Sequence, residues 1–285
     1  MKRATQKGAR STPVFSVDLF EDGLVFGQHR LESAQLWTGL PLALGSEGTV
    51  APLHSRYSIR PDNNVSQLEG HLQRLSRLGI LSSSVIFFGT VHDPMYPFEG
   101  RFDNALKLLQ VFQRYQPGVL VLQTRSPLLV IAMPALKALA DRLVVTIGIE
   151  TPDDSMARRY TPAIPAAEDR FKMARTLKRF HIPVHVQVNP VLPYGDWKRD
   201  AAPFAASLIE CSDAVFVAPL CNGSSSIERR VRRSPIGQRL ALDRKFHWLR
   251  PDAAEPLQQA LAILRPESAT PARAIIERQL KLFVA

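Results

Sequence analysis

The chain has 285 residues, 45% of them hydrophobic, which is enough to bury one large core in a single domain with smaller additions. No stretch approaches about 18 consecutive apolar residues and the basic N-terminus has no apolar segment behind it, so we expect a cytoplasmic protein without a signal peptide or membrane span. Two cysteines exclude a disulfide framework, and a formal charge of +10 favours nucleic acid, phosphorylated small molecules or an acidic protein as partners.

The first part of the chain is expected to be a basic tail followed by a β extension. Residues 1–12 are polar and basic, which is typical of a disordered tail. Two short apolar runs, VFSVDLF and GLVFGQHRL, are joined by Glu-Asp-Gly, and this pattern predicts a β-hairpin. Residues 38–53 are expected to form a loop, and the run YSIRP a strand that ends at Pro61. We therefore assign residues 13–60 to an N-terminal extension.

The segment from Val85 to Pro193 has the pattern of a repeated strand and helix. Four apolar runs end in polar residues and precede helix-length segments: VIFFGTVHDP, VLVLQTRSP, LVVTIGIETPDD and PVHVQVNPVLP. Such nearly continuous runs indicate strands buried on both faces, as in a parallel sheet. The helices are expected at residues 66–78, 103–115, 134–139, 166–180 and 201–210, with a short one starting at Asp153 and Asp154.

Asp103 is the expected N-cap of the second of these helices. The run AVFVAPL adds a last strand, so residues 61–223 are expected to form a βα barrel or an open parallel sheet. Residues 224–285 differ in character, with a basic run and two further helices at 255–264 and 272–282 that would cover the open side and end of the barrel. The basic run is either a solvated helical face or a phosphate-contacting patch formed by Arg229, Arg230, Arg232 and Arg233.

Polar side chains follow each of the four predicted strands of the repeat. Because the carboxyl ends of parallel strands meet at one edge, ligands bind there in βα folds. The residues to consider include His92, Thr151 and Pro190. The candidate ligand-binding set is Gly89, Thr90, Asp93, Thr124, Arg125, Ser126, Glu150 and Asn189.

Several of these side chains have a structural interpretation beside the functional one. Arg125 either anchors a carboxylate or phosphate or forms a salt bridge with Asp93 or Glu150. Glu150 likewise either binds a ribose or amine or pairs with Arg125, and Asp93 either contacts a ligand or forms an Asx turn before Pro94. His92 has no nucleophile to activate, and His185 alternates with valines, which indicates a core position.

The order of the motifs carries a resemblance to a known family. GTVHDP, QTRSPLL, GIETPDD with TPAIPAAEDR, and NPVLPYGD together resemble the core of radical S-adenosylmethionine proteins, specifically the spore photoproduct lyase-like group. The resemblance implies a partial (β/α)6 TIM-like barrel, here with a hairpin extension and C-terminal covering helices. It also implies S-adenosylmethionine as cofactor near the strand ends, and it includes a helix bearing Arg170.

The chain departs from this family at the cluster site. The family binds a 4Fe-4S cluster through CxxxCxxC after its first barrel strand, which YSIRP matches best, and the following DNNVSQLEGHL has no cysteine. The cluster, and any metal site, is therefore expected to be absent. Three hypotheses follow. The one we favour is a binding or scaffold protein that retains an S-adenosylmethionine or nucleotide pocket. The others are an enzyme that uses the barrel mouth, either lyase-like with radical chemistry or non-radical, and a nucleic-acid-associated accessory protein related to DNA repair.

Overall fold

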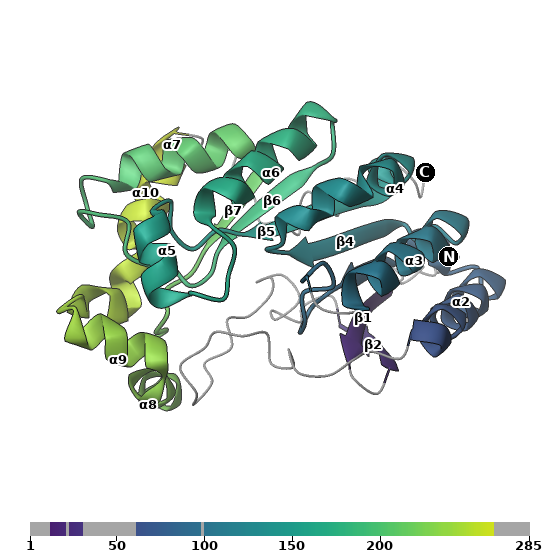
Figure 1. Ribbon diagram of the computed structural model, residues 1–285, viewed down its shortest axis with the longest axis horizontal. Coiled ribbons are helices and arrows are strands. Elements are labelled where there is room, and N and C mark those ends of the chain that lie inside the picture. The colour runs from purple at the N-terminus through teal and green to yellow at the C-terminus, as the bar shows by residue number, and fades with distance from the viewer. Residues whose placement is uncertain (1–11, 21–22, 31–60, 98–99, 265–285) are drawn as a thin grey trace, which may run out of the picture.

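The computed structural model describes residues 12–20, 23–30, 61–97 and 100–264. Within these ranges the chain forms an α/β fold with one seven-stranded, mostly parallel sheet and nine α-helices (Figure 1). None of the helices in the described part of the chain is long and apolar enough to cross a membrane. The expected tail at residues 1–11, loop at 38–53 and helix at 272–282 lie outside the described residues.

The sheet has the strand order β2-β1-β3-β4-β5-β6-β7, and all strands except β2 are parallel. The four apolar runs of the repeat and the last run each form a strand, as predicted. The bounds are β1 Val14–Phe20, β2 Gly23–His29, β3 Val85–Phe88, β4 Val119–Thr124, β5 Leu143–Gly148, β6 Val184–Val188 and β7 Ala214–Val217.

The N-terminal hairpin is confirmed, but it is not a separate extension. Strand β1 pairs with β2 in antiparallel fashion and with β3 in parallel, from Val14 opposite Val85 to Val17 opposite Phe88. Among the described residues β1 is therefore the first parallel strand of the sheet, a place that was predicted for YSIRP. Residues 57–60 lie outside the described part, and Pro61 begins a helix. Local pattern identifies a hairpin, whereas its place in a sheet depends on long-range packing.

Helices α2, α3, α4, α6 and α7 lie on one face of the sheet (Figure 1). Helix α10 packs on α7, while α9 contacts α5 and α8. The bounds are α2 Pro61–Arg77, α3 Arg101–Arg114, α4 Met133–Ala138, α5 Asp154–Tyr160, α6 Ala167–Arg179, α7 Ala201–Cys211, α8 Ser225–Arg233, α9 Pro235–Leu242 and α10 Glu255–Leu264.

The N-terminal ends of two helices test the predicted caps. Asp153 caps α5 as expected, because its carboxylate accepts hydrogen bonds from the backbone N–H groups of Ser155 and Met156. The prediction for α3 was wrong, since its N-cap is Gly100, with φ of 74°, and Asp103 lies inside the first turn. An acidic group there still interacts favourably with the helix dipole.

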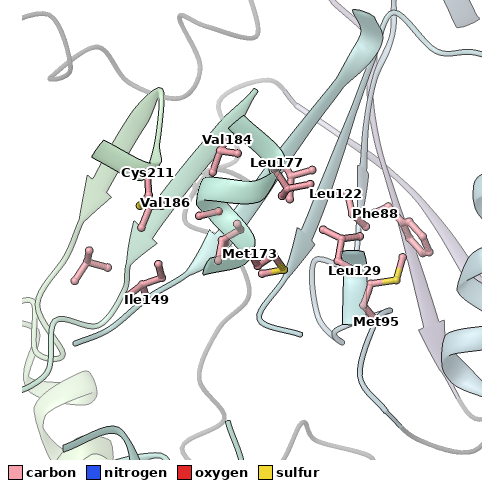
Figure 2. Close-up of a cluster of buried hydrophobic side chains, with 14 of the residues drawn as sticks. Phe88, Met95, Leu122, Leu129, Ile149, Met173, Leu177, Val184, Val186 and Cys211 are labelled. Carbon is pink, nitrogen blue, oxygen red and sulfur yellow. The ribbon is translucent and has the colours of Figure 1, made fainter. Parts of the chain in front are cut away.

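The main core lies between the sheet and these helices. Figure 2 shows Phe88 and Leu122 on the strands and Met173 and Leu177 on α6, all buried in one cluster. Each buried side chain of this size contributes about 1.5–3 kcal/mol. A smaller apolar cluster lies on the opposite face of the sheet, formed by Val14, Val85, Phe87, Val119, Val121 and Val144. The strands are thus apolar on both faces near their amino ends.

Candidate functional site

The second face of the sheet becomes polar toward the carboxyl ends of the strands. Gln123 lies two residues beyond Val121 and is in register with Thr146, which is in register with His185. Because residues in register on parallel strands point to the same side, these side chains share one face with the smaller apolar cluster. We call this set the polar face, and its buried members are Ser16, Asp18, Gln123, Thr146, His185 and Gln187.

His185 is a buried histidine on the polar face with one ring nitrogen unpaired among the described residues. Its ring is 2% exposed, and Nε2 has no hydrogen-bond partner among the described residues. Burial lowers the pKa of His185 to about 4, against a smaller opposing effect of Asp213, so the imidazole is neutral at physiological pH. The expected core position of His185 is confirmed, but the face that it occupies is polar.

Asp18, at the end of β1, anchors the loop after β3. Its carboxylate accepts hydrogen bonds from Thr90 Oγ1, at 2.5 Å, and from the backbone N–H of Val91, at 2.7 Å. Burial raises the pKa of Asp18, although these hydrogen bonds act to lower it. The sequence interpretation missed Asp18 because it placed β1 outside the sheet. The available signal was a single acidic residue within an apolar strand.

Asp93 joins the loop after β3 to the end of β4. Its two oxygens accept hydrogen bonds from Thr124 Oγ1 and the backbone N–H of Arg125, both at 2.7 Å. It also accepts one from the N–H of Met95 at 2.9 Å, which confirms the predicted Asx turn. Burial raises the pKa of Asp93 against these hydrogen bonds. Asp93 is therefore engaged within the protein.

Gly89 permits this close approach of the two loops. It has φ of 87°, and a Cβ built there would lie 2.5 Å from Pro94 Cδ and 2.9 Å from the carbonyl oxygen of Gln123. A side chain at this position would push β3 away from β4. Gly89 thus serves the geometry of the site, and it presents no side chain to the polar face.

A buried charge triad closes the carboxyl edge between β4 and β5. Arg125 Nε lies 2.7 Å from Glu150 Oε1, and Arg170 Nη1 lies 2.5 Å from Glu150 Oε2. Arg170, on α6, also donates to the carbonyl oxygen of Gly148. Burial acts to raise the pKa of Glu150, but the two guanidinium groups together outweigh it and hold that pKa below its ordinary value. The predicted salt bridge between Arg125 and Glu150 is confirmed.

Gly148 makes room for the triad on β5. A Cβ at Gly148 would lie 2.5 Å from Arg125 Nε and 2.8 Å from Arg125 Cζ. The guanidinium group of Arg125 therefore lies directly over the backbone of the neighbouring strand. This contact explains why a glycine stands in an otherwise apolar run.

The other candidates at this edge vary in their engagement. The backbone N–H of Ser126 donates to Thr124 Oγ1, and Ser126 Oγ is buried with no hydrogen-bond partner among the described residues. Thr151 Oγ1 donates to the carbonyl oxygen of Pro193. His92 is buried with its ring edge against Phe20. Asn189 is half-buried and precedes a cis bond to Pro190 at the end of β6.

The four candidate nucleic-acid residues lie on α8, away from the polar face. Arg229, Arg230, Arg232 and Arg233 are all exposed, and Val231 between them is buried. Their exposure on a helix is compatible with both predicted interpretations, a solvated helical face and a phosphate-contacting patch.

The two cysteines do not fit an iron–sulfur ligand set. Cys211 is buried in the main core, where burial raises the pKa of its thiol to about 12 (Figure 2). Cys221 lines a separate cavity beside α8. No group of three or more His, Cys, Asp or Glu side chains in the described ranges is placed to hold a metal ion. A cluster held by three thiolates has no counterpart in this chain, since the sequence has two cysteines.

Comparisons with known proteins add no relative. No protein-family model, curated protein or solved structure matches the chain. We therefore infer its function from the geometry of the polar face and from the order of its strand-end motifs.

Proposed function

We propose that the chain is a binding protein that holds a small polar ligand of the nucleoside class, with S-adenosylmethionine as the first candidate, against the polar face. The proposed framework is a partial (β/α)6 barrel of the radical S-adenosylmethionine type that lacks the cluster. The six parallel strands and the order of the motifs at their ends support this framework. The alignment of buried polar side chains across β1, β4, β5 and β6 is the observation that carries the proposal.

The polar face is costly unless its groups find partners. The interior of a βα barrel is ordinarily filled by bulky branched apolar side chains. The valines near the amino ends of β3, β4 and β5 follow that rule here, whereas polar side chains stand in their place at Gln123 and Thr146, further along β4 and β5, and at His185, the second residue of β6. A buried polar group without a hydrogen bond costs about 1–3 kcal/mol, so a ligand that forms a hydrogen bond with His185 Nε2, which has no partner among the described residues, would recover that free energy.

The chemistry of these side chains suits a nucleoside. Thr146 and Gln123 offer hydroxyl and amide groups that can bind ribose hydroxyls, and a neutral imidazole at His185 can donate to or accept from the edge of a base.

Binding is favoured over acid–base catalysis on this face. A general base works best when its pKa lies near the operating pH. The pKa of His185 is lowered to about 4, which makes its imidazole a weak base. Asp18 and Asp93 are engaged by backbone and hydroxyl donors.

Titration calorimetry with S-adenosylmethionine and S-adenosylhomocysteine tests the proposal. Thr146→Val keeps the shape of the side chain and removes one hydroxyl, so affinity should fall about 2- to 12-fold, the range for one net hydrogen bond. Thr176→Val is the matched control, because this threonine lies on α6 and bonds to the backbone of its own helix. Equal affinities for wild type and Thr146→Val, or no heat with wild type, would overturn the proposal.

Arg125 is a poor choice for that test. It belongs to the buried charge triad, so its removal is expected to change stability together with any binding.

A further inference from the structure

A second site lies beside α8, apart from the polar face. The stretch from residue 225 to residue 250 contains eight basic and two acidic side chains, which gives it a formal charge of +6 out of +10 for the whole chain. One of the two acidic residues, Asp243, is bound by Arg159 and Tyr160 of α5. The positive charge is therefore concentrated on one small part of the molecule.

The helical geometry places the arginines of α8 on one face. At 3.6 residues per turn, Arg229, Arg230, Arg232 and Arg233 fall within an arc of about 160°. Val231 points the opposite way and is fully buried, which fixes the orientation of the helix on the protein. The exposed side of α8 is thus a continuous row of guanidinium groups, and such a row binds phosphate groups with geometric specificity.

A cavity of about 460 Å³ opens next to this row. It lies between α8, the end of α9 and the 3-10 helix η4 (Phe246–Leu249), and sites for small organic groups are commonly about 300–1,000 Å³. Val231 and Cys221 are its buried members, and Leu249 adds a further apolar wall. Phe246 also lines the cavity although its side chain is 59% exposed. An aromatic ring is therefore available beside the arginines.

The walls of the cavity are firmly held. Trp248, in the same 3-10 helix as Phe246, is fully buried and packs edge-on against Tyr194 at 4.7 Å between ring centres. Arg250 forms a two-point ion pair with Asp252. The packing of Trp248 thus fixes the backbone of η4. Phe246 is therefore exposed on a helix that is itself anchored to the core.

We propose that this site binds single-stranded nucleic acid, with phosphates on the α8 arginines and one unstacked base in the cavity against Phe246. Base–aromatic stacking beside a cationic groove is the common way of binding single strands. Glu228 also lines the cavity and would repel a phosphate there, whereas its carboxylate can accept hydrogen bonds from the amino group of a base. An acidic protein segment would gain from the arginines but not from Phe246 or Glu228. The proposal does not depend on the ligand of the polar face.

Fluorescence anisotropy with labelled single-stranded DNA and RNA of about 12 nucleotides tests the base contact. Phe246→Ala should weaken binding about 5- to 150-fold, the effect of losing one stacked base, and should leave an abasic strand of the same length unaffected. Leu242→Ala is the matched control, because Leu242 is 78% exposed at the end of α9 and does not line the cavity. Thermal unfolding of both variants checks that they are folded.

The salt dependence of binding tests the phosphate contacts. Replacing both Arg229 and Arg233 by alanine should reduce the slope of log affinity against log salt by about 1.4, because each lost contact with a single strand contributes about 0.7. A variant with Arg77→Ala and Arg179→Ala removes the same charge from exposed positions on α2 and α6 and should keep the original slope.

Three outcomes would overturn the proposal. No binding at about 50 mM salt would mean that this surface does not bind nucleic acid. Affinity that is unchanged by Phe246→Ala would mean that the arginines form a basic surface and that the cavity does not bind a base. Competition by polyglutamate as effective as that by oligonucleotide would show that the arginines serve an acidic protein instead. Comparison of the affinities for the DNA and RNA strands shows which of the two nucleic acids the site prefers.

Discussion

The contact between Gly148 and Arg125 predicts a substitution whose cost depends on a second residue. In Gly148→Ala the new Cβ would lie 2.5 Å from Arg125 Nε, so the guanidinium group must leave its place beside Glu150. The clash itself can be relieved, because it involves the end of a long side chain. The lasting cost is the loss of a buried ion pair.

The size of this effect follows from two opposing contributions. Breaking one side of a buried ion pair costs about 3–5 kcal/mol. Replacing Gly148 by alanine also stabilises the protein by up to about 1 kcal/mol, because alanine lowers the conformational entropy of the unfolded chain. This gain applies here since Gly148 does not have a positive φ. Gly148→Ala should therefore lower the free energy of unfolding by about 2–5 kcal/mol. In an Arg125→Met background the same substitution should be neutral or slightly stabilising.

Urea unfolding of the four proteins of this double-mutant cycle, followed by circular dichroism and by tryptophan fluorescence, measures the coupling. Gly70→Ala is the control, because a Cβ there meets no atom within 4 Å and should stabilise α2 by about 0.5–1 kcal/mol. A cost of Gly148→Ala that is the same with and without Arg125 would refute the proposed geometry of the triad.

Two further predictions concern single groups. The pKa of His185 is about 4 in the folded protein and 6.5 in the unfolded chain, so the unfolded state takes up the proton first as the pH falls. The protein should therefore lose about 3 kcal/mol of stability between pH 6.5 and pH 4. His185→Gln should lack this part of the pH dependence, and parallel stability profiles of the variant and the wild type would contradict the prediction. Asp153→Ala removes the N-cap of α5 and should cost about 0.5–2 kcal/mol in urea unfolding, whereas an unchanged midpoint would mean that the cap contributes nothing.

The strands were predictable because their burial on two faces leaves continuous apolar runs. VLVLQT, for example, predicted a strand that the structure has at Val119–Thr124. The carboxyl-edge rule for parallel strands also brought Asp93, Thr124 and Arg125 together correctly. These features depend on neighbouring residues or on a general rule of βα folds, so one sequence is sufficient for them.

The rest depends on which elements meet in space. Asp18 belongs to the site because β1 lies beside β3, and nothing local to the hairpin indicates that pairing. The polar face needs the register of four strands, since His185 by itself is compatible with a satisfied core position. Arg170 reaches Glu150 only because α6 packs against the end of β5.

The short connection between β1 and β2 has a consequence for attempts to redesign this protein. Phe20 pairs with Gly23, so two residues separate β1 from β2. In the radical S-adenosylmethionine framework proposed above, the segment after the first strand would be a loop that carries three cysteines. Here the chain turns back at once and adds an antiparallel strand at that edge. Installing a cluster would therefore require replacing β2 and its connection to β1 by a longer loop. Cysteine substitutions on the paired strand β2 would not suffice, because successive side chains of a strand point to opposite faces.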